Sequence, residues 1–192
     1  LMVDKIIAKP QRILDACASP GGKAIHLAKK FPRSHLWAVE INERRFKTLL
    51  ENTQRIVCEN LTAVNDDCVS WASSQKPFDL IWLDAPCSGT GVLKKHPDIK
   101  RTITQEKIEK LQETQLKLLN NLWPFLEQDG LLVYSTCSIL GRENDDVIAT
   151  FISQHNLQVL PVESDRFSIA SQYGRYYPIS SYHGGYIAIL KK

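Results

Sequence analysis

Three cysteine-bearing loops, each directly after an apolar run, carry the side chains in this sequence that are most able to do chemistry. Cys17 follows RIL within DACASPGGK, Cys87 follows FDLIWL within DAPCSGTG, and Cys137 follows GLLVY within STCS. Apolar runs of this kind are typical of buried strands, and open α/β sheets hold their ligands beyond the carboxyl ends of the strands. We therefore expect two of these thiols, Cys87 and Cys137, to share one active site.

Two neighbouring thiols suit nucleophilic catalysis on a pyrimidine ring. A thiolate that adds to C6 turns C5 into an enamine-like carbanion that accepts a methyl group, and a base then removes the C5 proton so that the thiolate leaves. A reactive cysteine needs positive charge nearby, and Lys23 is a candidate source. Lone cysteines are usually buried for packing, an interpretation kept here for Cys58 and Cys68. The residues alone do not rank Cys87 against Cys137 as the attacking thiol.

The first loop and two acids indicate a cofactor that contains adenosine but no phosphates. The glycine pair of DACASPGGK permits close backbone approach at the start of a helix. Glu40 ends the second apolar run, where an acid accepts hydrogen bonds from ribose hydroxyls, and Asp66, or alternatively Asp67, follows the third run on the adenine side. Neither G-x-G-x-x-G nor G-x-x-x-x-G-K-[ST] occurs, which argues against a dinucleotide or a nucleoside triphosphate. S-adenosylmethionine fits this pattern, with Asp84 placed for its amino group.

Composition predicts one globular domain of ordinary type. The 192 residues are 43% hydrophobic and 23% charged, enough for a sizeable core. No apolar run is long enough to span a bilayer, and the first residues do not resemble a secretion signal. Five widely spaced cysteines without a C-x-x-C pair argue against a zinc site or a disulfide framework and favour the reducing cytoplasm. We expect a single catalytic domain over residues 1–192, with no metal and no membrane partner.

A cluster of basic residues follows the Cys87 loop. The net charge of +3 is weak evidence for a nucleic-acid partner, but its distribution is uneven. We call four residues the basic segment: Lys94, Lys95, Lys100 and Arg101. A solvated charged loop is the simpler interpretation, whereas the position beside a thiol-bearing loop favours contact with RNA phosphates.

Apolar runs that alternate with helical patterns predict a doubly wound, Rossmann-like α/β fold. Strands are expected over residues 12–17, 35–41, 61–65, 78–84, 130–136, 157–162 and 185–190. Helices are expected from the glycine pair to Pro32, after a cap at Asn42, from a cap at Thr104 to Pro124, and over residues 142–155. No helix separates the last two strands, so we expect a mainly parallel seven-stranded sheet with an antiparallel last strand. Residues 163–183 are expected to be irregular.

Taken together, the motifs DACASPGGK, LDAPCSGTG, HPDIK and VYSTCS resemble the RNA (cytosine-C5)-methyltransferases, in particular the bacterial Sun/Fmu-type 16S ribosomal RNA enzymes. The resemblance covers about residues 12–155. It implies a class I S-adenosylmethionine-dependent methyltransferase that makes 5-methylcytosine in 16S ribosomal RNA. The alternatives are methylation of another RNA such as tRNA, and a non-catalytic RNA-binding module on the same fold. A nicotinamide-dependent oxidoreductase is disfavoured by the missing dinucleotide motif.

The resemblance also implies roles for individual residues. Cys137 is similar to the family's nucleophile, and Cys87 to the second cysteine, which helps the product leave the adduct. Asp84 and Lys23 complete the expected catalytic group. The expected cofactor-binding residues are Cys17, Ala18, Ser19, Pro20, Gly21, Gly22, Lys23, Glu40, Asp66 and Asp84.

The sequence departs from the family pattern in several places, of which two concern the site and the helix after it, and the family adds one further expectation. Glu40 stands where the family usually has Asp, and residues 138–144 lack the Pro and one Glu of S-x-x-P-E-E-N, which leaves the start of the next helix open. The family's amino-terminal RNA-binding domain is expected to be absent from this chain.

Overall fold

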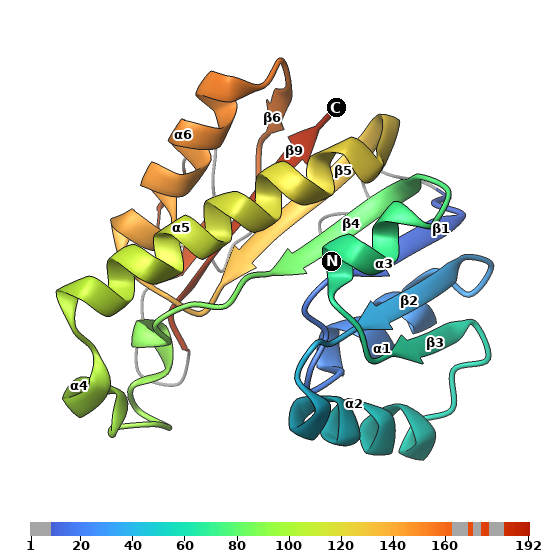
Figure 1. Ribbon diagram of the computed structural model, residues 1–192, viewed down its shortest axis with the longest axis horizontal. Coiled ribbons are helices and arrows are strands. Elements are labelled where there is room, and N and C mark those ends of the chain that lie inside the picture. The colour runs from blue at the N-terminus through green and yellow to red at the C-terminus, as the bar shows by residue number, and fades with distance from the viewer. Residues whose placement is uncertain (1–8, 163–168, 171–173, 177–182) are drawn as a thin grey trace.

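The computed structural model describes residues 9–162, 169–170, 174–176 and 183–192 and has the predicted Rossmann-like α/β fold (Figure 1). Within this part of the chain, nine strands form one sheet in the order β3-β2-β1-β4-β5-β9-β8-β7, and β6 pairs with β9. The strands are β1 (Arg12–Asp15), β2 (His35–Val39), β3 (Leu61–Val64), β4 (Phe78–Asp84), β5 (Leu126–Thr136), β6 (Gln158–Leu160), β7 (Ile169–Ala170), β8 (Gly174–Tyr176) and β9 (Gly185–Lys191). The helices are α1 (Gly22–Lys30), α2 (Glu43–Arg55), α3 (Cys68–Ser73), α4 (Ile99–Thr102), α5 (Gln105–Leu122) and α6 (Asp145–Gln154).

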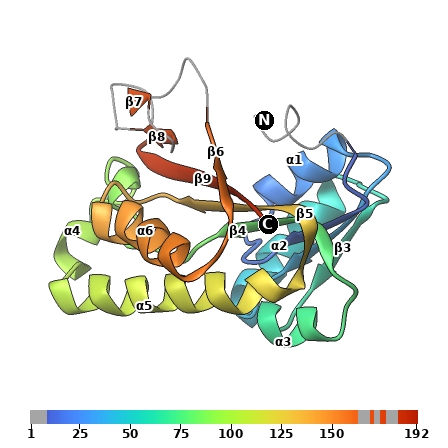
Figure 2. The same cartoon turned by 90° about the horizontal axis from the view of Figure 1, so that it is seen from above.

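Helices cover both faces of the sheet, which explains why its central strands are apolar throughout. In β4, Leu80 and Trp82 pack in the core under α1 and α2, whereas Ile81 and Leu83 pack under α3, α5 and α6. Successive side chains of a strand point to opposite faces, so a strand covered on both sides needs an unbroken apolar run. Figure 2 shows α5 and α6 on one side of the sheet and α1 on the other.

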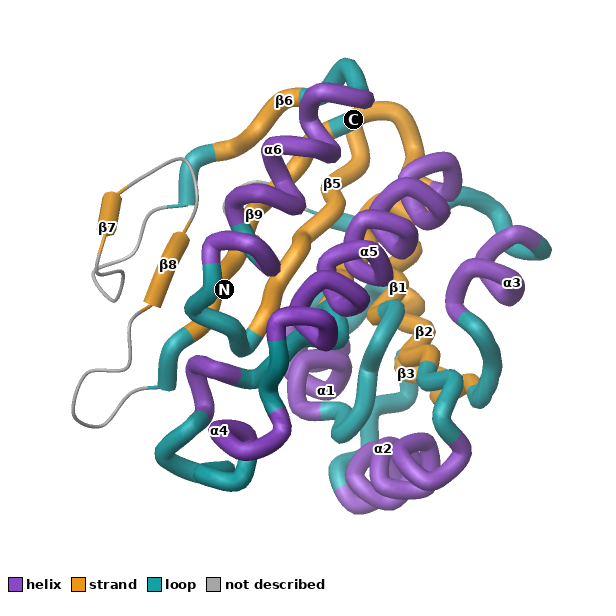
Figure 3. Tube along the Cα trace, turned by 60° about the vertical axis from the view of Figure 1, so that its left-hand side comes forward, coloured by secondary structure: helices purple, strands orange, loops and turns teal. Residues whose placement is uncertain are grey.

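Side-chain caps begin three of the helices. Asn42 accepts a hydrogen bond from the Arg45 amide at 3.0 Å, and Thr104 accepts one from the Lys107 amide at 3.2 Å, which confirms both predicted caps. Asp67 caps α3, a short helix that the sequence analysis did not identify. Figure 3 shows α4 just before the first turn of α5, and α6 beside α5 along the sheet.

The last strands depart in part from the sequence-based expectation. β9 is antiparallel to β5 and β6, as predicted. The expectation that residues 163–183 are irregular is wrong at Ile169–Ala170 and Gly174–Tyr176, because these form β7 and β8 and extend the sheet beyond seven strands. The remainder of that segment, residues 163–168, 171–173 and 177–182, lies outside the described residues.

Several element boundaries also differ from expectation. β1 ends at Asp15 and not at Cys17, and β5 begins at Leu126, ahead of the glycine that was expected to open it. A 3₁₀ turn over Gly141–Glu143 takes the place of the expected first turn of α6, which begins at Asp145. No helix in the described part of the chain is long and apolar enough to cross a membrane.

Candidate active site

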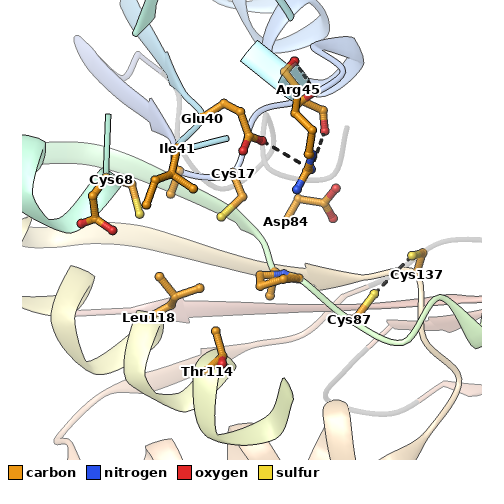
Figure 4. Close-up of a pocket in the computed structure, with 15 residues that line it drawn as sticks. Cys17, Glu40, Ile41, Arg45, Cys68, Asp84, Cys87, Thr114, Leu118 and Cys137 are labelled. Atoms are coloured by element: carbon orange, nitrogen blue, oxygen red, sulfur yellow. Dashed lines mark hydrogen bonds and ion pairs between the residues drawn. The ribbon is translucent and has the colours of Figure 1, made fainter. Parts of the chain in front are cut away.

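A cavity of about 590 Å³ opens at the carboxyl ends of β1, β2, β4 and β5 (Figure 4). Its wall includes Cys17 after β1, Glu40 after β2, Asp84 at the end of β4, and both Cys87 and Cys137. The volume lies within the range of cofactor-sized sites in proteins. The predicted convergence of the strand-end loops on one site is therefore what the structure shows.

Pairing of β4 with β5 brings the two thiols together. Asp84 lies opposite Ser135 in the parallel register, and the loops that follow these residues carry Cys87 and Cys137 with their sulfur atoms 3.2 Å apart. Cys87 is half-buried, whereas Cys137 is exposed. The more exposed thiol is the one that a substrate reaches first.

The two thiols are electrostatically unequal. The hydrogen bond between the two sulfur atoms lowers the pKa of Cys137; burial and the charge of Asp84 oppose this shift, and Lys23 supports it. The same hydrogen bond, with burial added, raises the pKa of Cys87 well above its usual value. Of the two thiols, Cys137 is therefore the one that ionises more readily.

Asp84 is held on both of its oxygens. Lys23 Nζ forms an ion pair with Oδ2, and Ser135 Oγ donates to Oδ1 at 2.9 Å. Trp82 Nε1 in turn donates to Ser135 Oγ at 3.1 Å. The carboxylate is thus fixed between the thiol pair and the first loop, and Lys23 provides the positive charge that the sequence analysis assigned to it.

A second set of polar groups lies beside β2. Glu40 is buried, accepts a hydrogen bond from the Asn42 amide at 3.0 Å, and faces Arg45 at 3.4 Å. Ile41, an apolar side chain that is 65% exposed, lines the cavity next to it. Ile41 was not among the residues expected at the site, because its exposure at the cavity is visible only in the structure.

Of the two candidate acids after β3, Asp67 lines the cavity and Asp66 does not. Asp67 Oδ1 accepts hydrogen bonds from the amides of Val69 and Ser70, so the turn into α3 directs this side chain toward the site. Asp66 is exposed and accepts from the Asp67 amide at 2.7 Å. The adenine-side role expected of Asp66, or alternatively of Asp67, stays a prediction, and the lining of the cavity favours Asp67.

A smaller cavity of about 210 Å³ extends along the first loop. Predicted cofactor-binding residues that line it are Cys17, Ala18, Ser19, Pro20, Gly22, Lys23 and Asp84. Gly21 lines neither cavity; its φ of 104° starts α1, and a Cβ there would lie 3.0 Å from Leu49. This glycine shapes the loop and is not in the wall of the site.

Asp15 lies at the bottom of the smaller cavity and is fully buried. Neither of its carboxyl oxygens has a well-formed hydrogen bond within the described part of the chain, although the nearby Cys17 amide acts to lower its pKa. Buried polar atoms are normally hydrogen-bonded, so oxygens without a partner in a polar pocket are available to a ligand. The ammonium group of a ligand could donate hydrogen bonds to them. Together with Glu40 and Asp67, these groups fit the predicted adenosine cofactor with an amino acid tail.

Three other groups complete the cavity. Cys68, assigned to packing by the sequence analysis, is buried and also lines the wall; its hydrogen bond with Cys17, followed by burial, raises the pKa of Cys17. From the opposite side α5 contributes Thr114 and Leu118 (Figure 4). Within the described residues, no three or more His, Cys, Asp and Glu side chains gather so as to hold a metal ion.

The basic segment lies outside both cavities. Its four residues are exposed and lie between the Cys87 loop and the first turn of α5. Figure 1 shows this part of the chain, with α4, beyond the carboxyl end of β4. The sequence-based expectation of an RNA contact there stays a prediction.

Comparison with known proteins adds a family to this geometry. The family model for the 16S rRNA methyltransferases RsmB/F matches residues 7–191. The chain belongs to this family. RsmB/F proteins are S-adenosylmethionine-dependent rRNA methyltransferases, so the predicted family and cofactor are confirmed.

RsmB/F relatives and solved structures agree with this assignment. The ribosomal RNA small subunit methyltransferase B of Yersinia pseudotuberculosis is 43% identical over 147 residues, which are 76% of this chain and 34% of that protein. The chain thus spans about a third of the curated relatives that it matches. The structure of NSun6 from Pyrococcus horikoshii with SFG has a TM-score of 0.81 and 28% identity over 95% of this chain and 48% of that one. A methyltransferase homolog from the same organism has a TM-score of 0.82 and 28% identity over 96% of this chain and 62% of that one.

Proposed function

We propose that this chain transfers a methyl group from S-adenosylmethionine to C5 of a cytosine in 16S ribosomal RNA through a covalent adduct with Cys137. The observation that carries the proposal is the thiol pair: Cys137 is exposed at the cavity, 3.2 Å from Cys87, with its pKa lowered chiefly by the hydrogen bond from Cys87. Covalent catalysis on a pyrimidine ring needs a nucleophile beside the cofactor, and an exposed thiol next to a cofactor-sized cavity can serve as that nucleophile. The second thiol can assist release of the product.

The residues that would hold the cofactor divide between its two ends. Glu40 would accept hydrogen bonds from the ribose hydroxyls, with Asp67 and Ile41 on the adenine side. The first loop, Asp15 and Lys23 would hold the methionine end, where an acid and a base match its ammonium and carboxylate groups. When bound, the cofactor supplies an electrophilic methyl group.

In the proposed reaction, the Cys137 sulfur uses a lone pair to form a bond to C6 of the cytosine. The electron pair of the C5–C6 double bond moves to C5 and is delocalised toward N3. C5 would use this pair to bond to the methyl carbon, while the methyl–sulfur bond breaks and its electron pair stays on the sulfur of the cofactor. A base then takes the C5 proton; the electron pair of that C–H bond re-forms the double bond, and the C6–S pair returns to Cys137. Cys87 assists this release, a role supported by its 3.2 Å distance from the Cys137 sulfur.

Asp84 is proposed to act where the cofactor and the target base meet. Its carboxylate is fixed by Lys23 and Ser135, so it meets an incoming polar group without reorganisation, and preorganised charge is a major source of catalytic rate. Lys23 adds positive charge that favours ionisation of Cys137. Both residues therefore support attack by the thiolate.

For the RNA, the basic segment is proposed to bind phosphates while the target cytosine enters the cavity from a single-stranded or flipped position. Residues 1–192 would then form the catalytic domain of a cytoplasmic enzyme. Membership in a family of 16S rRNA methyltransferases supports 16S ribosomal RNA as the substrate, and another RNA such as tRNA is the alternative.

The test is methylation of defined RNAs. Transcripts of 16S ribosomal RNA and of tRNA are incubated with the protein and S-adenosylmethionine, and the nucleosides are then analysed by mass spectrometry. We expect 5-methylcytosine in the 16S transcript only, and none with Cys137→Ala. Product in tRNA alone would favour the alternative substrate, whereas cofactor and RNA binding without any 5-methylcytosine would favour a non-catalytic RNA-binding module.

A further inference from the structure

Glu143 is a fully buried carboxylate that lies behind both thiol loops and has no part in the reaction proposed above. Its Oε1 accepts hydrogen bonds from the Ser88 amide at 2.7 Å and from Gln115 Nε2 at 3.3 Å. Its Oε2 accepts from the hydroxyl groups of Ser88 and Ser138. Each serine directly follows one of the two cysteines, so one carboxylate binds both loops next to the reactive sulfur atoms.

Further hydrogen bonds tie the same two loops together. Thr90 Oγ1 and Ser138 Oγ are 3.0 Å apart, and the Gly91 amide donates to the Cys137 carbonyl at 2.8 Å. Gln115, which is fully buried on α5, also donates to the Pro86 carbonyl at 2.9 Å. Because a buried carboxylate is tolerated only when several donors satisfy it, Glu143 and its donors hold each other in place. The separation of the two sulfur atoms therefore depends on this network.

The charge of Glu143 acts unequally on the two thiols. It adds to the hydrogen bond with Cys137 and to burial in raising the pKa of Cys87. The charged groups that act on Cys137 are Asp84, which opposes its ionisation, and Lys23, which favours it. Tyr134 lies beneath the pair; its hydroxyl donates to the Glu143 carbonyl at 2.6 Å, and burial raises its pKa. A negative charge on the Cys87 side thus adds to the groups that disfavour ionisation of Cys87.

We propose that Glu143 is a positioning residue that ties the Cys87 loop to the Cys137 loop and keeps Cys87 as the hydrogen-bond donor, so that Cys137 is the thiol that reacts. The role of Glu143 in catalysis rests on the proposed function. Its effect on the relative reactivity of the two thiols is a property of the protein without RNA or cofactor. It assigns a role to the one acid that remains of the family's paired glutamates.

The test is competitive alkylation of the free protein with iodoacetamide across a pH series, read for each cysteine by peptide mass spectrometry. Glu143→Gln removes the charge and keeps the shape of the side chain. We expect the labelling ratio of Cys87 to Cys137 to rise by about three- to tenfold, which corresponds to about half a pKa unit to one unit, and the pH midpoint for Cys137 to move upward. Cys58, outside both cavities, is the internal reference.

Two further variants make the outcome decisive. Glu109→Gln is the matched control, because Glu109 is an exposed acid paired with Arg142, the neighbour of Glu143; its labelling ratio should equal that of the wild type. Ser138→Ala removes the contact on the Cys137 side and keeps the charge, and we expect a smaller rise in the ratio.

An unchanged ratio in a Glu143→Gln protein with a native unfolding transition would overturn the proposal, as would an equal rise in Glu109→Gln. If Glu143→Gln does not fold, Ser138→Ala decides: an unchanged ratio there rejects the proposal, and a rise supports it. The labelling uses neither RNA nor cofactor, so its result stands separately from that of the methylation assay.

Discussion

Asp15 should make the stability of this protein fall as the pH rises from mildly acidic to mildly basic. Burial, with the charge of Asp84 added and that of Lys23 opposing, raises the pKa of this carboxyl from its usual 3.8 to about 7. A group that binds its proton more tightly in the folded state stabilises the fold fully below pH 3.8, and this contribution is lost as the pH rises through about 7. Between pH 5 and pH 8 most of the loss occurs over about two pH units below the folded pKa. At 1.36 kcal/mol per unit, the stabilisation by Asp15 falls by roughly 3 kcal/mol.

The measurement compares Asp15→Asn with the wild type by urea unfolding at pH 5 and at pH 8. The amide cannot ionise, so the variant lacks this pH dependence. Its free energy of unfolding, relative to that of the wild type, should therefore be about 3 kcal/mol higher at pH 8 than at pH 5. Any constant cost of burying the amide cancels in this difference. Asp66→Asn, at an exposed carboxylate, is the control and should follow the wild type. Parallel profiles for Asp15→Asn and the wild type would refute the reasoning.

Three further predictions concern the loops of the site. Gly91→Ala would place a Cβ 2.2 Å from the Gly184 carbonyl oxygen and 2.7 Å from that of Cys137, so we expect methylation to fall at least tenfold while calorimetry shows a lower melting temperature; an unchanged rate would contradict this packing. Glu40→Gln removes a buried charge beside the proposed ribose site, and isothermal titration should show about tenfold weaker S-adenosylmethionine binding, as expected for about 1.4 kcal/mol. Neutralising the basic segment with Gln should weaken RNA binding and reduce the salt slope, measured by fluorescence anisotropy; the same slope as the wild type would reject the RNA contact.

Several elements were predictable because their signals are local. β4 coincides with the predicted strand over residues 78–84, since a strand covered on both faces needs a continuous apolar run. The caps at Asn42 and Thr104 were predictable because a short polar side chain before an apolar periodicity has few other roles. The helix α3 has only six residues, too few for a periodic pattern to identify it.

The sequence identified the loops that form the site, but not which of their side chains face the cavity or contact one another. Strand order brings Cys87 next to Cys137, and the motifs alone named both residues. The choice between Asp66 and Asp67 turned on one residue of chain, and the cap of α3 decided which side chain faces the cavity. Glu143 contacts Ser88 across 55 positions of sequence, so no local pattern could indicate that an acid in a divergent motif joins the two thiol loops.

The most direct test of the central claim, attack by Cys137, uses RNA that contains 5-fluorocytosine at the target position. Fluorine at C5 blocks the final proton removal, so the S–C6 bond persists once the methyl group has been transferred. With S-adenosylmethionine present, we expect a protein–RNA complex that survives a denaturing gel, is lost in Cys137→Ala and persists in Cys87→Ala. An adduct that survives Cys137→Ala and disappears in Cys87→Ala would contradict the account.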